Sequence, residues 1–252
     1  MIFAARNSGD ALDFFIFLLM TLVAVCIALV LHEVAHGLVA KWNGDYTAKY
    51  EGRLTLNPLK HIDPIGFLMM MLVGFGYAKP VPVNPYNYKH RKRGMITVAI
   101  AGVVTNLILA FVSTLFGSLM ILAYNRAVFG FASEGVINFC WYMINFFNIL
   151  TTINLALLFF NILPIFPLDG YRLVESFTHR GNRFCVFMRT NGQYILYGLV
   201  GLSFIVSMAF NYVGTLPSWF GYIDILGTYL DFFVNKLAWV FQEFWWLMIP
   251  II

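Results

Sequence analysis

Four long apolar runs constrain this chain more than any other feature. They cover residues 12–30, 96–122, 136–163 and 195–212. A helix needs about 20 mostly apolar residues to cross the hydrocarbon core of a membrane. Only 11% of the 252 residues are charged, whereas a soluble domain carries about 25%. The sequence therefore predicts an all-α polytopic membrane protein.

A fifth apolar run, residues 232–252, is interrupted by Lys236, Gln242 and Glu243. We interpret it as a further span whose polar residues face protein, with a helix at the membrane surface as the alternative. The total expected is about five transmembrane helices. The first run has neither a basic leader nor a small-residue cleavage site, so we expect it to be retained.

The positive charges are unevenly distributed. Most of the 16 lysine and arginine residues lie in residues 41–93 and 172–189, and the loops at 125–135 and 211–231 hold almost none. Cytoplasmic loops carry an excess of Lys and Arg. This pattern predicts an external N-terminus and two cytoplasmic basic segments. The net charge of +4 therefore reports topology and does not require a nucleic-acid partner.

Residues 44–85 are the least helical part of the sequence, because they are rich in Gly, Pro and Asn. Residues 65–73 are apolar but too short to span, which favours a re-entrant or interfacial segment. The prolines that follow forbid a helix and impose an extended backbone. Such backbone is tolerated at membrane depth only where protein covers it or it lines a cavity, so we expect this segment to border a cavity.

An HExxH motif, made by His32, Glu33 and His36, follows the first apolar run and lies near the end of the hydrophobic helix predicted there. Residues i and i+4 share one helical face, so both imidazoles can reach one metal ion. Glu33 is placed to take a proton from an attacking water. The alternative is three polar side chains reaching the membrane surface from a helix end. Ionisable residues inside a membrane helix are costly, which favours function.

A catalytic zinc site needs a third protein ligand. Asp169 is favoured because Pro164 and Pro167 break the preceding apolar helix just before it. Asp169 lies three residues before Arg172, and His36 lies five before Lys41, so their depths match. A Pro-Leu-Asp-Gly turn that merely closes a helix is the alternative. The other candidate ligands are His61, Asp63, His90 and His179.

Asn106 is an amide within the second apolar run. Such an amide often bonds to a neighbouring helix. It can equally donate to an oxyanion beside a metal. Its sequence position leaves both roles open.

These motifs resemble the site-2 protease family of intramembrane zinc metalloproteases. Residues 52–66 and 78–84 resemble its bacterial branch that lacks a PDZ domain, and the resemblance covers roughly residues 25–175. The motifs that carry it are His32-Glu33-Xaa-Xaa-His36 and Asn161-Xaa-Xaa-Pro164-Xaa-Xaa-Pro167-Leu-Asp169-Gly170.

The resemblance implies one Zn²⁺ per chain, bound by His32, His36 and Asp169. It implies Glu33 as general base, and Asn106 as a catalytic residue that positions substrate or stabilises the intermediate. Two residues depart from the family pattern: Val103 and Phe166 stand where relatives often have proline. Neither departure removes a reactive group.

A substrate-binding segment is expected at Tyr77, Lys79, Val81, Val83 and Asn84. An unwound substrate has unpaired backbone groups, and pairing it with an extended segment satisfies both. Pro80 and Pro82 lack N–H donors on one edge, which leaves Val81 and Val83 free to donate on the other. The resemblance also implies a substrate-binding hairpin here.

The resulting hypothesis is an intramembrane zinc metalloprotease that cleaves within or next to transmembrane helices. The alternatives are a zinc-binding membrane transporter and a scaffold that does not cut. We expect one membrane-embedded domain over residues 1–252, with a catalytic core at about 12–175 and C-terminal helices at 191–252. The expected setting is a bacterial cytoplasmic membrane with the site towards the cytoplasm. The partners are lipid and a transmembrane protein substrate.

Overall fold

The computed structural model describes residues 11–66, 69, 76, 78–179, 181–213 and 217–249. Most of the chain is helical. The elements, in order, are α1 (Ala11–Trp42), α2 (Thr47–Tyr50), η2 (Pro58–Lys60), η3 (Pro85–Asn87), α4 (Arg91–Phe129), α5 (Glu134–Asn161), α6 (Asp169–Phe177), α7 (Arg183–Val213), η4 (Ser218–Ile223) and α8 (Ile225–Met248). The predicted all-α architecture is confirmed.

Four helices in the described part of the chain are long and apolar enough to cross a membrane. They are α1, α4, α5 and most of α7, and each contains all or nearly all of one predicted run. Most of the fifth run falls in α8, a helix of 24 residues. Three charged residues interrupt α8, and its spanning of the membrane stays a prediction.

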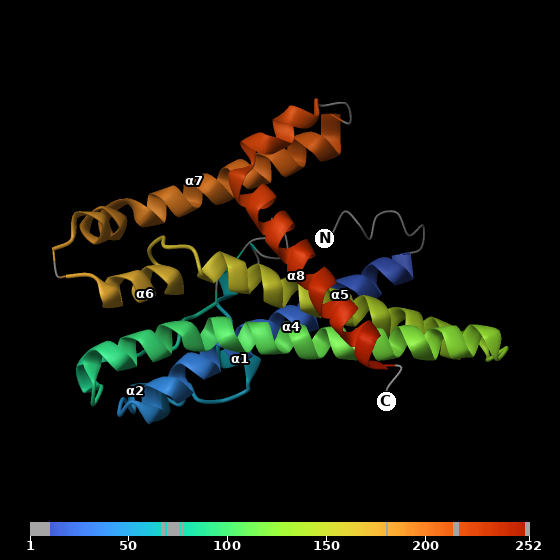
Figure 1. Cartoon of the computed structure of the whole chain (residues 1–252), viewed down its shortest axis with the longest axis horizontal. Helices are drawn as coiled ribbons and strands as arrows, with labels where there is room; N and C mark the ends of the chain where they lie inside the picture. The colour runs from blue at the N-terminus through green and yellow to red at the C-terminus, as the bar shows by residue number, and fades with distance from the viewer. Residues whose placement is uncertain are drawn as a thin grey trace.

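The helices α1, α4 and α5 pack together, and α8 crosses α4 and α5. In Figure 1, α7 lies apart from this bundle. It contacts the bundle through α8 and through Leu196, which packs on Ile165 and Leu168 of the α5–α6 turn. Small residues permit close helix packing in membranes. Ala24 and Ala28 of α1 meet Leu150 and Ile153 of α5. The bundle therefore brings α1 close to α4 and α5, where the polar motifs lie.

The helix ends follow local sequence signals. The chain leaves α1 through Gly44, whose φ of 105° suits glycine. The α5 helix ends at Asn161, before Pro164 and Pro167, as predicted. The next helix, α6, begins at Asp169. The two helix ends that carry the motifs are thus fixed by glycine and proline.

The described residues of the 78–84 segment are non-helical, as predicted. Ala78 forms an antiparallel bridge with Ile62, and the Lys79 N–H donates to the His61 carbonyl at 2.7 Å. Arg53 Nη2 donates to the Lys79 carbonyl, also at 2.7 Å. These bonds hold one end of the segment against the preceding loop. The predicted re-entrant stretch 65–73 lies mostly outside the described residues, as does Tyr77.

Candidate metal centre

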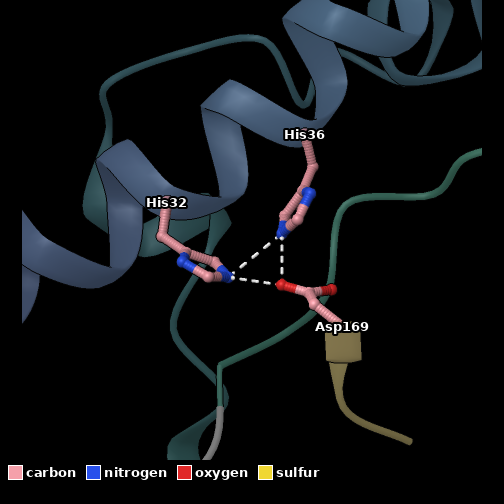
Figure 2. A group of neighbouring side chains, drawn as sticks. All are labelled: His32, His36 and Asp169. Carbon is pink, nitrogen blue, oxygen red and sulfur yellow. Dashed lines mark hydrogen bonds and ion pairs between the residues drawn. The ribbon is translucent and has the colours of Figure 1, made fainter. Parts of the chain in front are cut away.

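Three buried side chains converge between α1 and the start of α6 (Figure 2). His32 Nε2 lies 3.0 Å from His36 Nε2. Asp169 Oδ2 lies 3.3 Å from His32 Nε2 and 3.0 Å from His36 Nε2. Among the described residues, this is the group of histidine, cysteine and carboxylate side chains that can hold a metal ion. The sequence-based ligand set is therefore brought together in space.

The three candidate ligands come from two distant parts of the chain. One turn of α1 separates His32 from His36, which puts both rings on one face. Asp169 is the first residue of α6. The turn before it is packed on α7 through a cluster of Ile165, Leu168 and Leu196. The turn after α5 thus delivers the carboxylate to the histidine pair.

His36 is oriented by a backbone carbonyl. Its Nδ1 lies 2.7 Å from the Val98 carbonyl oxygen of α4. A carbonyl only accepts, so Nδ1 carries the proton and the Nε2 of the neutral ring presents a lone pair. Metal-binding histidines typically make such a bond through their other nitrogen. The His36 ring is therefore set for metal binding.

The converging atoms fit a cation. Asp169 Oδ2 is buried and receives no hydrogen bond, although two imidazole nitrogens face it. A buried polar atom without a partner is costly, and a shared metal ion satisfies all three ligand atoms. The donor set is two imidazoles and one carboxylate, which suits zinc with one position left open.

Gly102 of α4 lies against the two imidazole rings. A Cβ at this position would overlap the rings of both His32 and His36. Only a residue without a side chain lets α4 pass this close. The absence of that atom leaves room beside the two Nε2 atoms.

Glu33 follows His32 on α1 and is half-buried. Its Oε2 accepts a hydrogen bond of 2.8 Å from the Val81 N–H. Gly37, one turn later, leaves room for the Val81 side chain, whose Cγ1 would lie 3.0 Å from an added Cβ. One face of α1 thus holds Val81 by its backbone and its side chain. The expectation that the Val81 N–H is free to donate to substrate is therefore wrong, because Glu33 already accepts from it.

Asn106 is fully buried and contacts His32. Its Oδ1 lies 2.6 Å from His32 Nδ1. Its Nδ2 donates to Asn154 Oδ1 at 3.2 Å. Of the two roles left open by the sequence, the one observed is bonding across helices.

The other four candidate ligands are not part of this group of converging side chains. His61 is buried, with its Nε2 2.8 Å from the Thr55 carbonyl oxygen. Asp63 Oδ1 accepts from the N–H groups of Ile65 and Gly66. His90 and His179 are exposed.

Sequence reasoning did not find Asp45. This carboxylate is fully buried, and its Oδ2 accepts from the Asn84 N–H at 2.6 Å. Its Oδ1 accepts from Asn87 Nδ2 at 2.9 Å and from the Thr47 N–H at 3.1 Å. Burial alone would raise the pKa of Asp45, but these hydrogen bonds outweigh it and lower the pKa below its usual value. Asp45 thus ties the far end of the 78–84 segment to the end of α1.

Asn154 of α5 was also missed. It is a fully buried amide within an apolar helix. An amide inside an apolar run is visible in the sequence, and that signal could have identified it.

Comparison with known proteins gives a consistent assignment. The family model of Peptidase family M50 matches residues 20–208. YwhC of Bacillus subtilis, assigned by its name to the zinc metalloproteases, is 42% identical over 64% of this chain and 70% of its own length. Rip2 of Mycolicibacterium smegmatis, with the same class of name, is 32% identical over 59% of this chain and 53% of its own.

A more distant relative comes from an archaeon. MJ0611 of Methanocaldococcus jannaschii, also named for zinc metalloprotease activity, is 28% identical over 62% of this chain and 70% of its own length. No solved structure matches the chain significantly. The family match includes α4, α5, α6 and most of α1 and α7, with all three converging ligands. The chain belongs to peptidase family M50, the site-2 protease family, and is an integral membrane zinc metalloprotease.

Proposed function

We propose that this chain hydrolyses peptide bonds within or next to transmembrane helices of membrane proteins, with Glu33 as the general base. The observation that carries the assignment is the convergence of His32, His36 and Asp169 beside Glu33 on α1. When bound, zinc supplies a Lewis acid that polarises a carbonyl and acidifies water. His32, His36 and Asp169 would hold it.

Glu33 has one carboxylate oxygen bonded to the Val81 N–H. The other oxygen is left to take a proton from the attacking water and return it to the leaving amine. A hydrogen bond to one oxygen fixes the direction of the other. Val81 thereby orients the base.

The 78–84 segment would bind the substrate as an added strand. Lys79 and Val81 use their N–H groups within the protein. Among the described residues, the Val83 N–H has no hydrogen-bond acceptor. Val83 is therefore the donor that we assign to substrate, and Asn84 anchors the segment through Asp45. A substrate helix must unwind locally to pair here.

The whole chain would act as one membrane-embedded domain, with its core at about 12–175 and its C-terminal helices at 191–252. The charge pattern supports an external N-terminus and a site that opens to the cytoplasm. A bacterial cytoplasmic membrane is the proposed setting, and its lipids and a transmembrane substrate are the proposed partners.

The test uses Glu33→Gln in the full chain. The amide keeps the size of the side chain and can accept from Val81, but it cannot take a proton from water. We expect normal zinc content, cleavage reduced by about 10²–10⁴-fold, and a membrane-spanning substrate trapped on the variant in membrane proteomics. Near-normal cleavage by the variant would exclude Glu33 as the base and favour transport or scaffolding.

A further inference from the structure

Three helices are joined by a continuous chain of buried side-chain hydrogen bonds. On α5, Asn154 Nδ2 donates to the Leu150 carbonyl at 2.8 Å. Asn154 Oδ1 accepts from Asn106 Nδ2 of α4 at 3.2 Å. Asn106 Oδ1 lies 2.6 Å from Nδ1 of His32 on α1. Both amide side chains are fully buried, with 0% exposure.

The direction of every bond in this chain is fixed from its α5 end. The Leu150 carbonyl only accepts, so it must face the amide nitrogen of Asn154. The Asn154 oxygen then faces Asn106, which must present its own nitrogen. The Asn106 oxygen is left for His32, so His32 Nδ1 must carry a proton. A proton on Nδ1 leaves the Nε2 lone pair directed at Asp169 and the metal position.

We infer that Asn154 is a positioning residue for the metal centre, acting through Asn106 to fix the tautomer and ring orientation of His32. The inference rests on the metal site of the proposed function. We call the series Leu150 carbonyl, Asn154, Asn106 and His32 the relay. His36 needs no relay, because the Val98 carbonyl orients its ring directly. The two imidazoles are thus oriented by different devices, and only that of His32 depends on α5.

The amide pair has a property that a general packing role does not require. Asparagine can accept a hydrogen bond from one neighbour while it donates to another. With two asparagines in series, the acceptor carbonyl of Leu150 determines which atom of each amide faces its neighbour, and so which His32 nitrogen carries the proton. An apolar residue at position 154 would leave Asn106 Nδ2 without an acceptor. Asn106 would then be free to turn its nitrogen to His32 and favour the wrong tautomer.

The test compares Asn154→Val with Asn154→Thr in the full chain. The two substituents have nearly the same shape, so they cost similar packing. A threonine hydroxyl can donate to the carbonyl four residues earlier, here Leu150, while its oxygen accepts from Asn106. We expect Asn154→Val to lower zinc affinity, measured by chelator competition, by about 10–100-fold. Asn154→Thr should recover a clear part of it.

Two further measurements separate positioning from structural damage. The visible spectrum of cobalt-substituted protein depends on the geometry of the ligands. It should therefore change in Asn154→Val and return towards that of wild type in Asn154→Thr. Thr151→Val is the matched control: Thr151 is buried on the same helix and contacts Thr114 at 3.4 Å, away from the ligands. It should leave zinc affinity and spectrum unchanged.

A double-variant cycle supplies the final criterion. In an Asn106→Val background, Asn154→Val should add little further loss, because the relay is already cut. Equal affinities for the Val and Thr variants, an equal loss in Thr151→Val, or additive losses in the cycle would each overturn the inference. If wild-type protein binds no zinc, the metal site itself fails. A zinc-binding wild type with unaffected Asn154 variants removes only the relay.

Discussion

The Val81 N–H donates to the carboxylate of Glu33, with 2.8 Å between Val81 N and Glu33 Oε2. The two residues lie 48 positions apart. The bond joins the segment proposed to bind substrate to the residue proposed to activate water. Substrate placement and base orientation are therefore linked by one hydrogen bond, which can be removed without changing Glu33.

Val81→Pro removes this donor. Val81 precedes Pro82 and so is already restricted to extended conformations, which a proline also adopts. The freed carboxylate is misaligned, and we expect kcat to fall on the order of 100-fold while zinc content stays normal. Val81→Ala retains the N–H and is the control, with a much smaller loss. Equal activity in the two variants would mean that Glu33 does not need this bond.

Val83→Pro removes the N–H that we assign to the substrate strand. Because Val83 makes no contact with Glu33 through that group, the expected effect is a raised KM, with cleavage strongly reduced at low substrate. Val83→Ala keeps the backbone donor and should do much less. The readout is cleavage of a transmembrane substrate over a range of concentrations. Normal cleavage by Val83→Pro would show that another element holds the substrate.

Gly102→Ala tests the close packing of α4 against the two imidazoles. The added Cβ would overlap both rings, so we expect zinc affinity to drop by roughly tenfold or more. Gly117→Ala is the matched control on the same helix, because its Cβ would meet the nearest atom at an ordinary 3.5 Å. Similar zinc binding in both variants would contradict the proposed packing.

Asp169→Ala and His61→Ala separate the third ligand from the nearest rival candidate. Asp169 is within 3.3 Å of both Nε2 atoms, whereas His61 bonds to a loop carbonyl. Metal analysis should find zinc largely lost from Asp169→Ala and retained in His61→Ala, which is instead expected to be less stable. The reverse ranking would make His61 the ligand.

Asp45 predicts a pH dependence of stability. Its pKa is lowered in the folded protein by hydrogen bonds that outweigh burial. A lowered pKa stabilises the fold above the unfolded value, about 3.9, and that contribution disappears as pH falls towards the folded value. The difference in melting temperature between wild type and Asp45→Asn should therefore be largest near neutral pH and shrink below about pH 4. A difference that is constant with pH would contradict this.

Residues related by local periodicity could be predicted from the sequence. The spacing of His32 and His36 places both rings on one face wherever a helix forms. Asp169 could be singled out because two prolines end α5 just before it and because its expected depth in the membrane matches that of His36. Alternation along an extended backbone predicted free N–H donors at Val81 and Val83, but the Val81 N–H is bonded to Glu33, and the role of Val83 stays a prediction.

Partners across the bundle could not be predicted. Glu33 meets Val81 because Gly37 lets the segment approach α1, and a sequence does not show which segments approach. Asp45 and Asn84, 39 positions apart, and Asn106 and Asn154, 48 apart, are paired by helix packing. Polar residues in apolar runs mark such contacts without naming the partner.

The division of the ligands between α1 and α6 has a consequence for biosynthesis. The histidine pair emerges from the ribosome early, but Asp169 follows only after about two thirds of the chain has been made. Until α5 is inserted and the following turn docks, two imidazoles alone face each other. A complete zinc site of the proposed kind therefore cannot form before α5 and the turn that carries Asp169 have been made.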